Sequence, residues 1–221
     1  MERVSVYVDG LNFYYGLKRF IQVDNDWKKF YWIDFVQLFE HYNLKNHVLQ
    51  KVYYFSTPPL NILKSNRQGK LFEANKLLNG DRFEVVTGKF YEKMQRCPVC
   101  NATFTKPEEK RTDVNISVQM MLDCAMDNTD VLILVSADSD LFPPLEAIKK
   151  EYPAKKIRIF FPPKSFSYDL SNFIKANKGK IIFLERGKKK FSNSIMPDVV
   201  TVGNNSSSIP QHWKVAPVTN I

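Results

Sequence analysis

The sequence predicts an α/β protein with an open, mainly parallel sheet and helices on both faces. Short runs of branched and aromatic apolar residues alternate with segments whose apolar residues recur at helical spacing, an order typical of parallel sheets. The run VLILV at 131–135 is apolar throughout, as expected for a strand that is buried on both faces. A chain of 221 residues with 44% hydrophobic content is also long enough to bury a core of its own.

The predicted elements alternate from the N-terminus onward. A first strand at 3–8 ends at Asp9-Gly10, and helical spacing of apolar residues follows over 11–20. The other predicted strands occupy 48–55, 83–87, 131–136, 157–161 and 180–184. The other predicted helices lie near 32–42, 64–79, 112–127 and 143–151.

The same pattern suggests how the chain is divided. We expect residues 1–186 to form one domain, with an insertion at 92–111 that carries a Cys-x-x-Cys motif. We expect 187–221 to be an extended C-terminal tail, because it contains polar runs and few periodic apolar residues. Pro197, Pro210, Trp213 and Pro217 suggest that parts of it nevertheless pack on the domain or on a neighbour, because a lone exposed Trp is unusual.

Composition narrows the function classes. The 32 Lys and Arg residues exceed the 23 Asp and Glu residues, and a net charge of +9 favours polyanionic partners such as nucleic acid. No apolar run approaches the roughly 20 residues of a membrane span, and three cysteines form no disulfide framework, so we expect a cytoplasmic protein without a membrane partner. The sequence contains no glycine-rich phosphate-binding loop, so it does not favour a nucleoside triphosphatase.

Acidic residues follow two of the predicted strands. Asp138 and Asp140 come directly after the strand at 131–136, and Asp9 ends the first strand. Ligands bind outside the carboxyl ends of parallel strands, so these carboxylates face one crevice if the first and fourth strands are neighbours. Like charges placed so close need a compensating cation. The alternative is local, since Asp and Ser also cap helices and an Asp-Gly pair also makes turns.

A fourth carboxylate, Asp113, is predicted in the first turn of the helix at 112–127. Interaction with the helix dipole is a sufficient reason for one Asp there, but it does not explain all four. Asn12 begins the first predicted helix, where its amide could hold a carboxylate, a water or a phosphate.

Three stretches together resemble the NYN domain, a branch of the PIN-like metal-dependent nucleases that includes LabA-like proteins. They are VSVYVDGLNFYYG at 4–16, KRTDVNISVQMMLDCAMDNTDVLILVSADSDL at 110–141 and IRIFFPPKSFSYDL at 157–170. The resemblance covers about residues 3–185 and implies a PIN-like, Rossmann-like three-layer fold. It also implies that Asp9, Asp113, Asp138 and Asp140 gather round a divalent metal, with Asn12 and Ser136 in supporting positions. Ala137 departs from the glycine that the family usually has between Ser136 and Asp138.

Oxygen ligands without His or Cys suit Mg²⁺ or Mn²⁺. Such ions acidify a water and stabilise the oxyanions of phosphodiester hydrolysis, which makes a metal-dependent nuclease the leading hypothesis. The resemblance points to RNA as the substrate. The alternative is a catalytically silent nucleic-acid-binding or regulatory module of the same fold.

Basic and aromatic residues are candidates for holding the substrate. Lys110 and Arg111 lie beside Asp113, and other basic clusters occur at 64–76 and 188–190. Tyr14, Tyr15, Phe90 and Tyr91 could stack on unpaired bases, which favours single-stranded substrate. The alternative is that the lysines are solvated surface and the tyrosines are core.

Cys97 and Cys100 have the spacing of half a zinc site. The other half is absent nearby in the sequence, so a structural Zn²⁺ would need ligands from elsewhere in the fold or from a second chain in a homodimer. The alternative is a turn with two reduced thiols.

Overall fold

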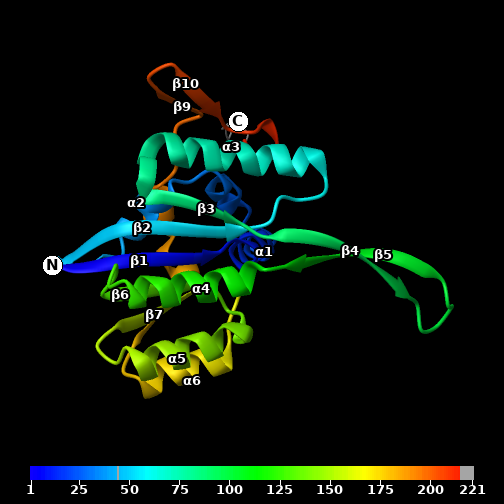
Figure 1. Cartoon of the computed structure of the whole chain (residues 1–221). Helices are drawn as coiled ribbons and strands as arrows, with labels where there is room; N and C mark the ends of the chain where they lie inside the picture. Colours follow the sequence, from blue (N-terminus) through cyan, green and yellow to red (C-terminus); the bar gives the residue numbers. More distant parts are fainter. Residues whose placement is uncertain (44, 215–221) are drawn as a thin grey trace.

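The computed structural model describes residues 1–43 and 45–214, apart from the side chains of 106 and 107. Its centre is a six-stranded sheet in the order β3-β2-β1-β6-β7-β8, in which all neighbouring strands are parallel (Figure 1). The strands are β1 (Glu2–Asp9), β2 (His47–Ser56), β3 (Phe83–Thr87), β6 (Val131–Val135), β7 (Lys156–Phe161) and β8 (Lys180–Phe183). This open sheet confirms the predicted fold class, and all six strands correspond to predicted ones.

Helices cover both faces of the sheet and make a three-layer structure (Figure 1). One face carries α1 (Gly10–Ile21), the 3₁₀ helix η1 (Asn25–Tyr31), α2 (Phe35–Glu40) and α3 (Ile62–Asn79). The other carries α4 (Thr112–Ala125), α5 (Phe142–Glu151) and α6 (Tyr168–Ala176). Within β6, Ile133 and Val135 pack toward the first face and Leu132 and Leu134 toward the second, which explains the unbroken apolar run.

The order of the strands creates a switch point between β1 and β6. The chain adds β2 and β3 on one side of β1, and then returns to build β6, β7 and β8 on the other side. The crossovers that leave the carboxyl ends of β1 and β6 go to opposite faces of the sheet, which opens a crevice between these two ends. Direct pairing of β1 with β6 therefore places the ends of the first and fourth predicted strands side by side.

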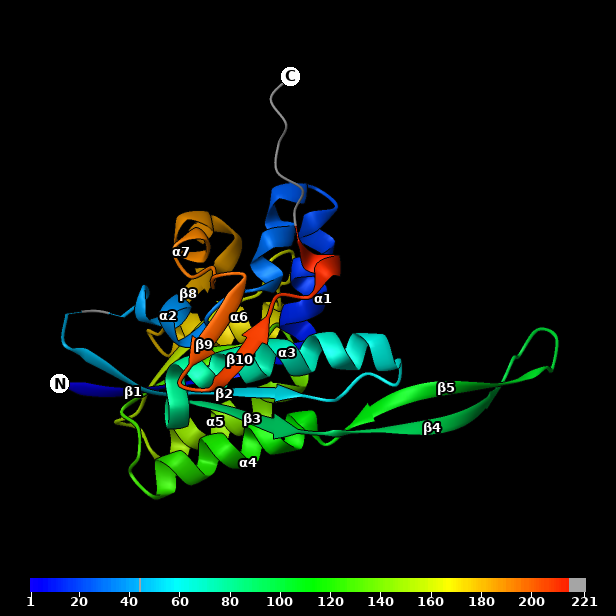
Figure 2. The same ribbon diagram turned by 90° about the horizontal axis from the view of Figure 1, so that it is seen from above.

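The predicted insertion forms an antiparallel ribbon. Strands β4 (Lys89–Arg96) and β5 (Thr103–Lys110) pair along their whole length and project far beyond the sheet as an arm (Figures 1 and 2). The arm begins directly after β3 and ends directly before α4, so its base lies at the carboxyl edge of the sheet.

The segment after residue 187 is folded over its described length rather than extended. It follows η4 (Leu184–Gly187) and contains α7 (Lys188–Ser192), a hairpin of β9 (Val199–Val202) and β10 (Asn205–Ser208), and η5 (Gln211–Trp213). The hairpin lies over α3 (Figures 1 and 2), and Phe191, Met196, Val200 and Trp213 belong to the core. These apolar residues are widely spaced in sequence, so no periodicity indicates their burial. Residues 215–221 lie outside the described ranges, and within those ranges no helix has the length and apolarity to cross a bilayer.

Candidate metal centre

Asp9 is the last residue of β1 and the N-cap of α1. Its side chain is 4% exposed. One carboxylate oxygen, Oδ1, accepts from the backbone N–H of Asn12 at 3.0 Å, and the other, Oδ2, accepts from the hydroxyl of Ser136 at 2.8 Å. Asp9 thus caps α1, and the same carboxylate is also held by the loop that follows β6.

Ser136 and Asn12 connect the end of β1 to the loop after β6. The Ser136 hydroxyl is buried and also accepts from the backbone N–H of Asp138 at 3.0 Å. The Asn12 side-chain oxygen accepts from the backbone N–H of Ala137 at 3.3 Å. Ala137 does not have a positive φ, so alanine in place of glycine is accommodated without backbone strain here. Both expected supporting residues therefore fix the geometry of this loop.

Three of the four predicted carboxylates converge. One oxygen from each of Asp9, Asp113 and Asp138 lies within 4.8 Å of the other two, and they come from β1, from the first turn of α4 and from the loop after β6. The fourth, Asp140, is exposed in the next turn, where its backbone N–H donates to Asp138 Oδ1 at 3.0 Å. The structure thus gathers an acidic group at the switch point, with Asp140 beside it.

Burial and mutual repulsion disfavour the charged states of Asp9 and Asp113. Burial raises the pKa of Asp9 to about 6, helped by the charges of Asp113 and Asp138 and opposed by the hydrogen bonds from Asn12 and Ser136. The pKa of Asp113 is also raised, first by partial burial and then by the charges of Asp138, Glu109 and Asp140. A cation placed among these oxygens would relieve the repulsion.

Comparison with known proteins agrees with this geometry. The model of the NYN domain family matches residues 3–178, which is most of the chain. The chain belongs to the NYN domain family. The two strand-end motifs and the first turn of α4 that supply the acidic group all lie inside the matched range. Membership brings a nuclease-like, PIN-family function with it.

Two individual proteins are similar to this NYN chain. A curated 6-hydroxy-3-succinoylpyridine 3-monooxygenase from Pseudomonas putida is 24% identical over 180 residues, which is 66% of this chain and 55% of the relative. The chain therefore spans about half the length of that relative. A solved structure of a Vibrio parahaemolyticus protein of unknown function superposes with a TM-score of 0.53 at 20% identity, covering 82% of this chain and 93% of the other. The second likeness supports the fold alone.

The NYN domain has a further carboxylate, Glu109, that sequence reasoning missed. It is the penultimate residue of β5, and its charge contributes to the raised pKa of Asp113. Its Oε1 accepts from the hydroxyls of Thr57 at 2.7 Å and Thr112 at 2.6 Å. These bonds tie the base of the arm to the ends of β2 and α4. The spacing of four residues between Glu109 and Asp113 is the only local signal, and it is weak because the two residues lie in different elements.

The predicted basic residues divide into paired and unpaired groups. Lys110 pairs with Glu108 at 2.8 Å, and Arg111, with φ 79°, donates to the Tyr91 hydroxyl at 3.2 Å. Lys188 pairs with Asp24 and Asp26, so it binds its own chain. By contrast, Lys64 and Arg67 of α3 line a cavity beside the acidic group.

Cys97 and Cys100 lie in the turn at the tip of the arm (Figure 2). The Cys97 N–H donates to the Ala102 carbonyl at 2.8 Å, and Asn101 adopts a left-handed φ of 57°. Backbone N–H groups of Cys100 and Val99 lower the pKa of the Cys97 thiol, which favours a thiolate. Among the described residues, no His, Asp or Glu joins this pair to make a metal-binding group, so one chain supplies only two ligands.

If a second chain completes this site, protein purified without chelator should contain about half a zinc atom per chain, because four thiolates then share one ion. Elemental analysis measures this directly. Cys97→Ser should remove the zinc and convert dimers into monomers, whereas Cys124→Ser, in the buried helix α4, should change neither. A zinc content near zero would leave the turn as two reduced thiols.

Proposed function

We propose that this protein is a metal-dependent nuclease that hydrolyses phosphodiester bonds in single-stranded RNA. The observation that carries the proposal is the acidic group of Asp9, Asp113 and Asp138 at the switch point of an NYN domain. Its location at the carboxyl ends of neighbouring parallel strands is where open α/β sheets bind ligands.

The donor set fits Mg²⁺ or Mn²⁺. All three side chains offer hard oxygen ligands. The elevated pKa of Asp9 reflects its burial first and then the charges of Asp113 and Asp138. Asp9, Asp113 and Asp138 would hold the ion, and Asp140 would add negative charge beside them. When bound, such an ion acidifies a water and neutralises charge on the phosphate.

The chain's own residues would orient the reacting groups. Asn12 binds both Asp9 and the loop after β6, and the Ser136 hydroxyl in that loop donates to Asp9. These bonds would keep the carboxylates of Asp9 and Asp138 at a fixed separation before substrate binds. Lys110 and Arg111 lie at the base of the arm directly before α4, where they would contact the backbone on either side of the scissile phosphate.

Incubation of purified protein with labelled RNA and DNA, each single- and double-stranded, in Mg²⁺, Mn²⁺ and EDTA tests the proposal. Cleavage of single-stranded RNA that requires metal would support it. Binding without cleavage under every metal condition would instead support the catalytically silent module. The monooxygenase name of the Pseudomonas relative applies to a protein of which the match with this chain covers only 55%.

Metal affinity should depend on pH because a cation displaces the proton of Asp9. The raised pKa of about 6 means that Asp9 is mostly protonated at pH 5 and ionised at pH 7.5. We expect Mn²⁺ to bind about tenfold more weakly at pH 5.0 than at pH 7.5, as measured by calorimetric titration. Equal affinities at the two pH values would show that Asp9 does not bind the ion.

Nucleic-acid binding should be strongly salt-dependent. If Lys110 and Arg111 contact phosphates, the log–log slope of affinity against salt should become shallower by roughly 0.7 for each lost contact when both are replaced by Ala. Lys150→Ala, at the exposed end of α5, is the matched control. An unchanged slope in the Lys110 and Arg111 variant would assign these residues to solvated surface.

A further inference from the structure

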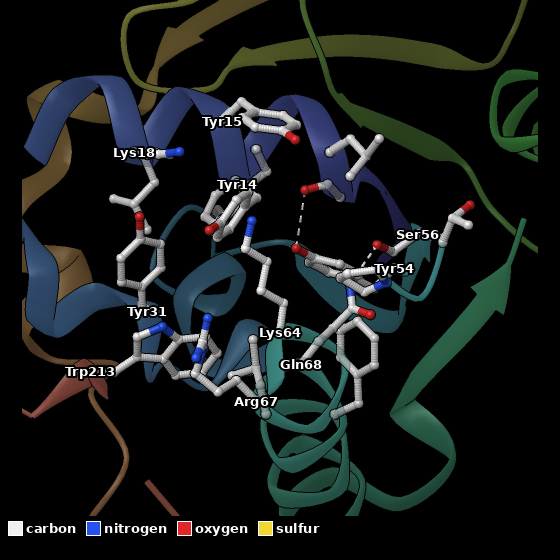
Figure 3. Close-up of a pocket in the computed structure, with 18 of the residues that line it drawn as sticks. Tyr14, Tyr15, Lys18, Tyr31, Tyr54, Ser56, Lys64, Arg67, Gln68 and Trp213 are labelled. Carbon is white, nitrogen blue, oxygen red and sulfur yellow. Dashed lines mark hydrogen bonds between the residues drawn. The ribbon is translucent and has the colours of Figure 1, made fainter. Parts of the chain in front are cut away.

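A cavity of about 300 Å³ opens beside the acidic group on the α1 face of the sheet (Figure 3). Helices α1 and α3 form its two sides, and Tyr31 with Trp213 lies at one end. Gly10 and Leu11, the two residues that follow Asp9, also line it. A volume of this size suits one small ring system with a substituent, and its wall begins one residue from a candidate metal ligand.

One wall is a row of aromatic rings. The rings of Tyr14 and Tyr31 have centroids 5.6 Å apart, and Tyr31 stacks on Trp213 at 5.5 Å. Tyr14 is half-buried and Tyr15 is 49% exposed, so part of this ring surface remains open to a ligand. Such faces bind flat rings by stacking, whatever the substituents of the ring.

The opposite wall is cationic. Lys64 and Arg67 of α3 face Tyr14 and Lys18 of α1 across the cavity (Figure 3). No acidic residue lines the cavity, and within the described part of the chain none of these three basic side chains has a carboxylate within 4.0 Å. Three uncompensated positive charges beside stacked rings favour a ligand that is both aromatic and anionic.

The floor of the cavity is held in place without a ligand. The buried Tyr54 hydroxyl donates to the Gly10 carbonyl at 3.4 Å, and the Gln68 side-chain amide donates to the Ser56 hydroxyl at 2.9 Å. These bonds tie α1 and α3 to the end of β2. The cavity is therefore preformed, which lowers the entropic cost of binding.

We propose that this cavity receives an unpaired nucleobase of the single-stranded substrate next to the phosphate at the acidic group, with Lys64 and Arg67 on the neighbouring phosphate. The inference rests on the proposed function and adds its recognition element. A base in a duplex stays stacked within the helix and does not enter so small a cavity, whereas a single strand offers both the ring and the phosphates. A small aromatic carboxylate would match the rings but carries one anionic group for three cations.

Binding to the full-length protein in EDTA tests the proposal apart from any cleavage. The probes are a single-stranded uridine tetranucleotide and the same backbone with abasic riboses. Trp213 lines the cavity and reports on it, whereas Trp27 and Trp32 are 1% and 0% exposed and are not among the residues that line it. We expect the intact probe to quench tryptophan fluorescence and to bind about tenfold more tightly than the abasic one. Trp213→Phe should abolish the quenching.

Substitutions inside and outside the cavity distinguish binding in the cavity from general electrostatic attraction to the protein surface. Arg67→Ala and Lys64→Ala should each lower the affinity for the intact probe about tenfold. Lys70→Ala, on the same helix but outside the cavity, should change that affinity by no more than about twofold. Equal binding of the intact and abasic probes would overturn the proposal. So would nicotinate that binds as tightly as the tetranucleotide with the same dependence on Arg67. Base-dependent binding without metal-dependent cleavage would support the nucleobase site and overturn the proposed hydrolysis. Metal-dependent cleavage without base-dependent binding would support the hydrolysis and overturn the nucleobase site.

Discussion

Asp138→Asn should reduce Mn²⁺-dependent cleavage by at least about a hundredfold while leaving the fold intact. The amide keeps the shape of the carboxylate but removes the charge that the cation requires. Asp138 is also the N-cap of the 3₁₀ helix η3 (Ser139–Leu141), and asparagine caps as well as aspartate does. Turnover measured with labelled single-stranded RNA, together with a urea unfolding curve, separates lost chemistry from lost stability.

The matched control is Asp81→Asn. Asp81 is an exposed carboxylate in the turn after α3, without an ion pair among the described residues. This substitution removes one charge from the surface and should leave turnover unchanged. Near-normal cleavage by the Asp138 variant would rule out the acidic group as the metal-binding centre.

Gly10→Ala should destabilise the fold by about 3 kcal/mol or more. A Cβ at this position would lie 2.4 Å from the ring carbon Cε1 of Tyr54 and 2.5 Å from the carbonyl oxygen of Phe55. The Tyr54 ring is buried and the carbonyl belongs to β2, which is paired on both sides, so neither can move away at low energetic cost. Because Gly10 follows Asp9 directly, the shift that relieves the clash should also displace the candidate metal ligand.

Gly69→Ala is the control for the same substitution inside a helix. Nothing lies within 4 Å of a Cβ added at Gly69 in the middle of α3, and alanine should stabilise that helix by about 1 kcal/mol. Urea unfolding of both variants measures the difference. A Gly10→Ala protein as stable as the parent would mean that the β1–α1 junction is looser than its contacts indicate.

The contrast between Gly10 and Gly69 shows that the junction between β1 and α1 has no room for a larger residue. Close approach of α1 to β2 brings the Gly10 carbonyl to the Tyr54 hydroxyl and leaves Asp9 in a buried position between two strands. The same approach leaves the cavity open between α1 and α3. Packing at one glycine therefore positions both the acidic group and the proposed nucleobase site.

Local sequence determined the secondary structure of the sheet and the position of the acidic residues along it. Apolar runs such as 131–135 are short-range signals, and Asp9 and Asp138 follow their strands within a few residues. The position of Asp9 and Asp138 after their strands therefore predicted that both lie at the carboxyl edge of a parallel sheet, without knowledge of any distant contact. The order of motifs also indicated the family, which the comparison confirmed.

Tertiary structure decided which residues meet. Pairing of β1 with β6 joins residues more than 120 apart in sequence, and only this pairing brings Ser136 to Asp9. The contact of Glu109 with Thr57, which are 52 residues apart, and the stacking of Trp213 on Tyr31 also depend on elements that are far apart in the sequence. After residue 187, the lone Trp213 indicated that parts of this segment pack on the domain, but no sequence pattern marked Phe191, Met196 and Val200 as core residues. Such contacts depend on the path of the whole chain, because each forms only when elements far apart in sequence are packed against the same sheet, and no local periodicity records that packing.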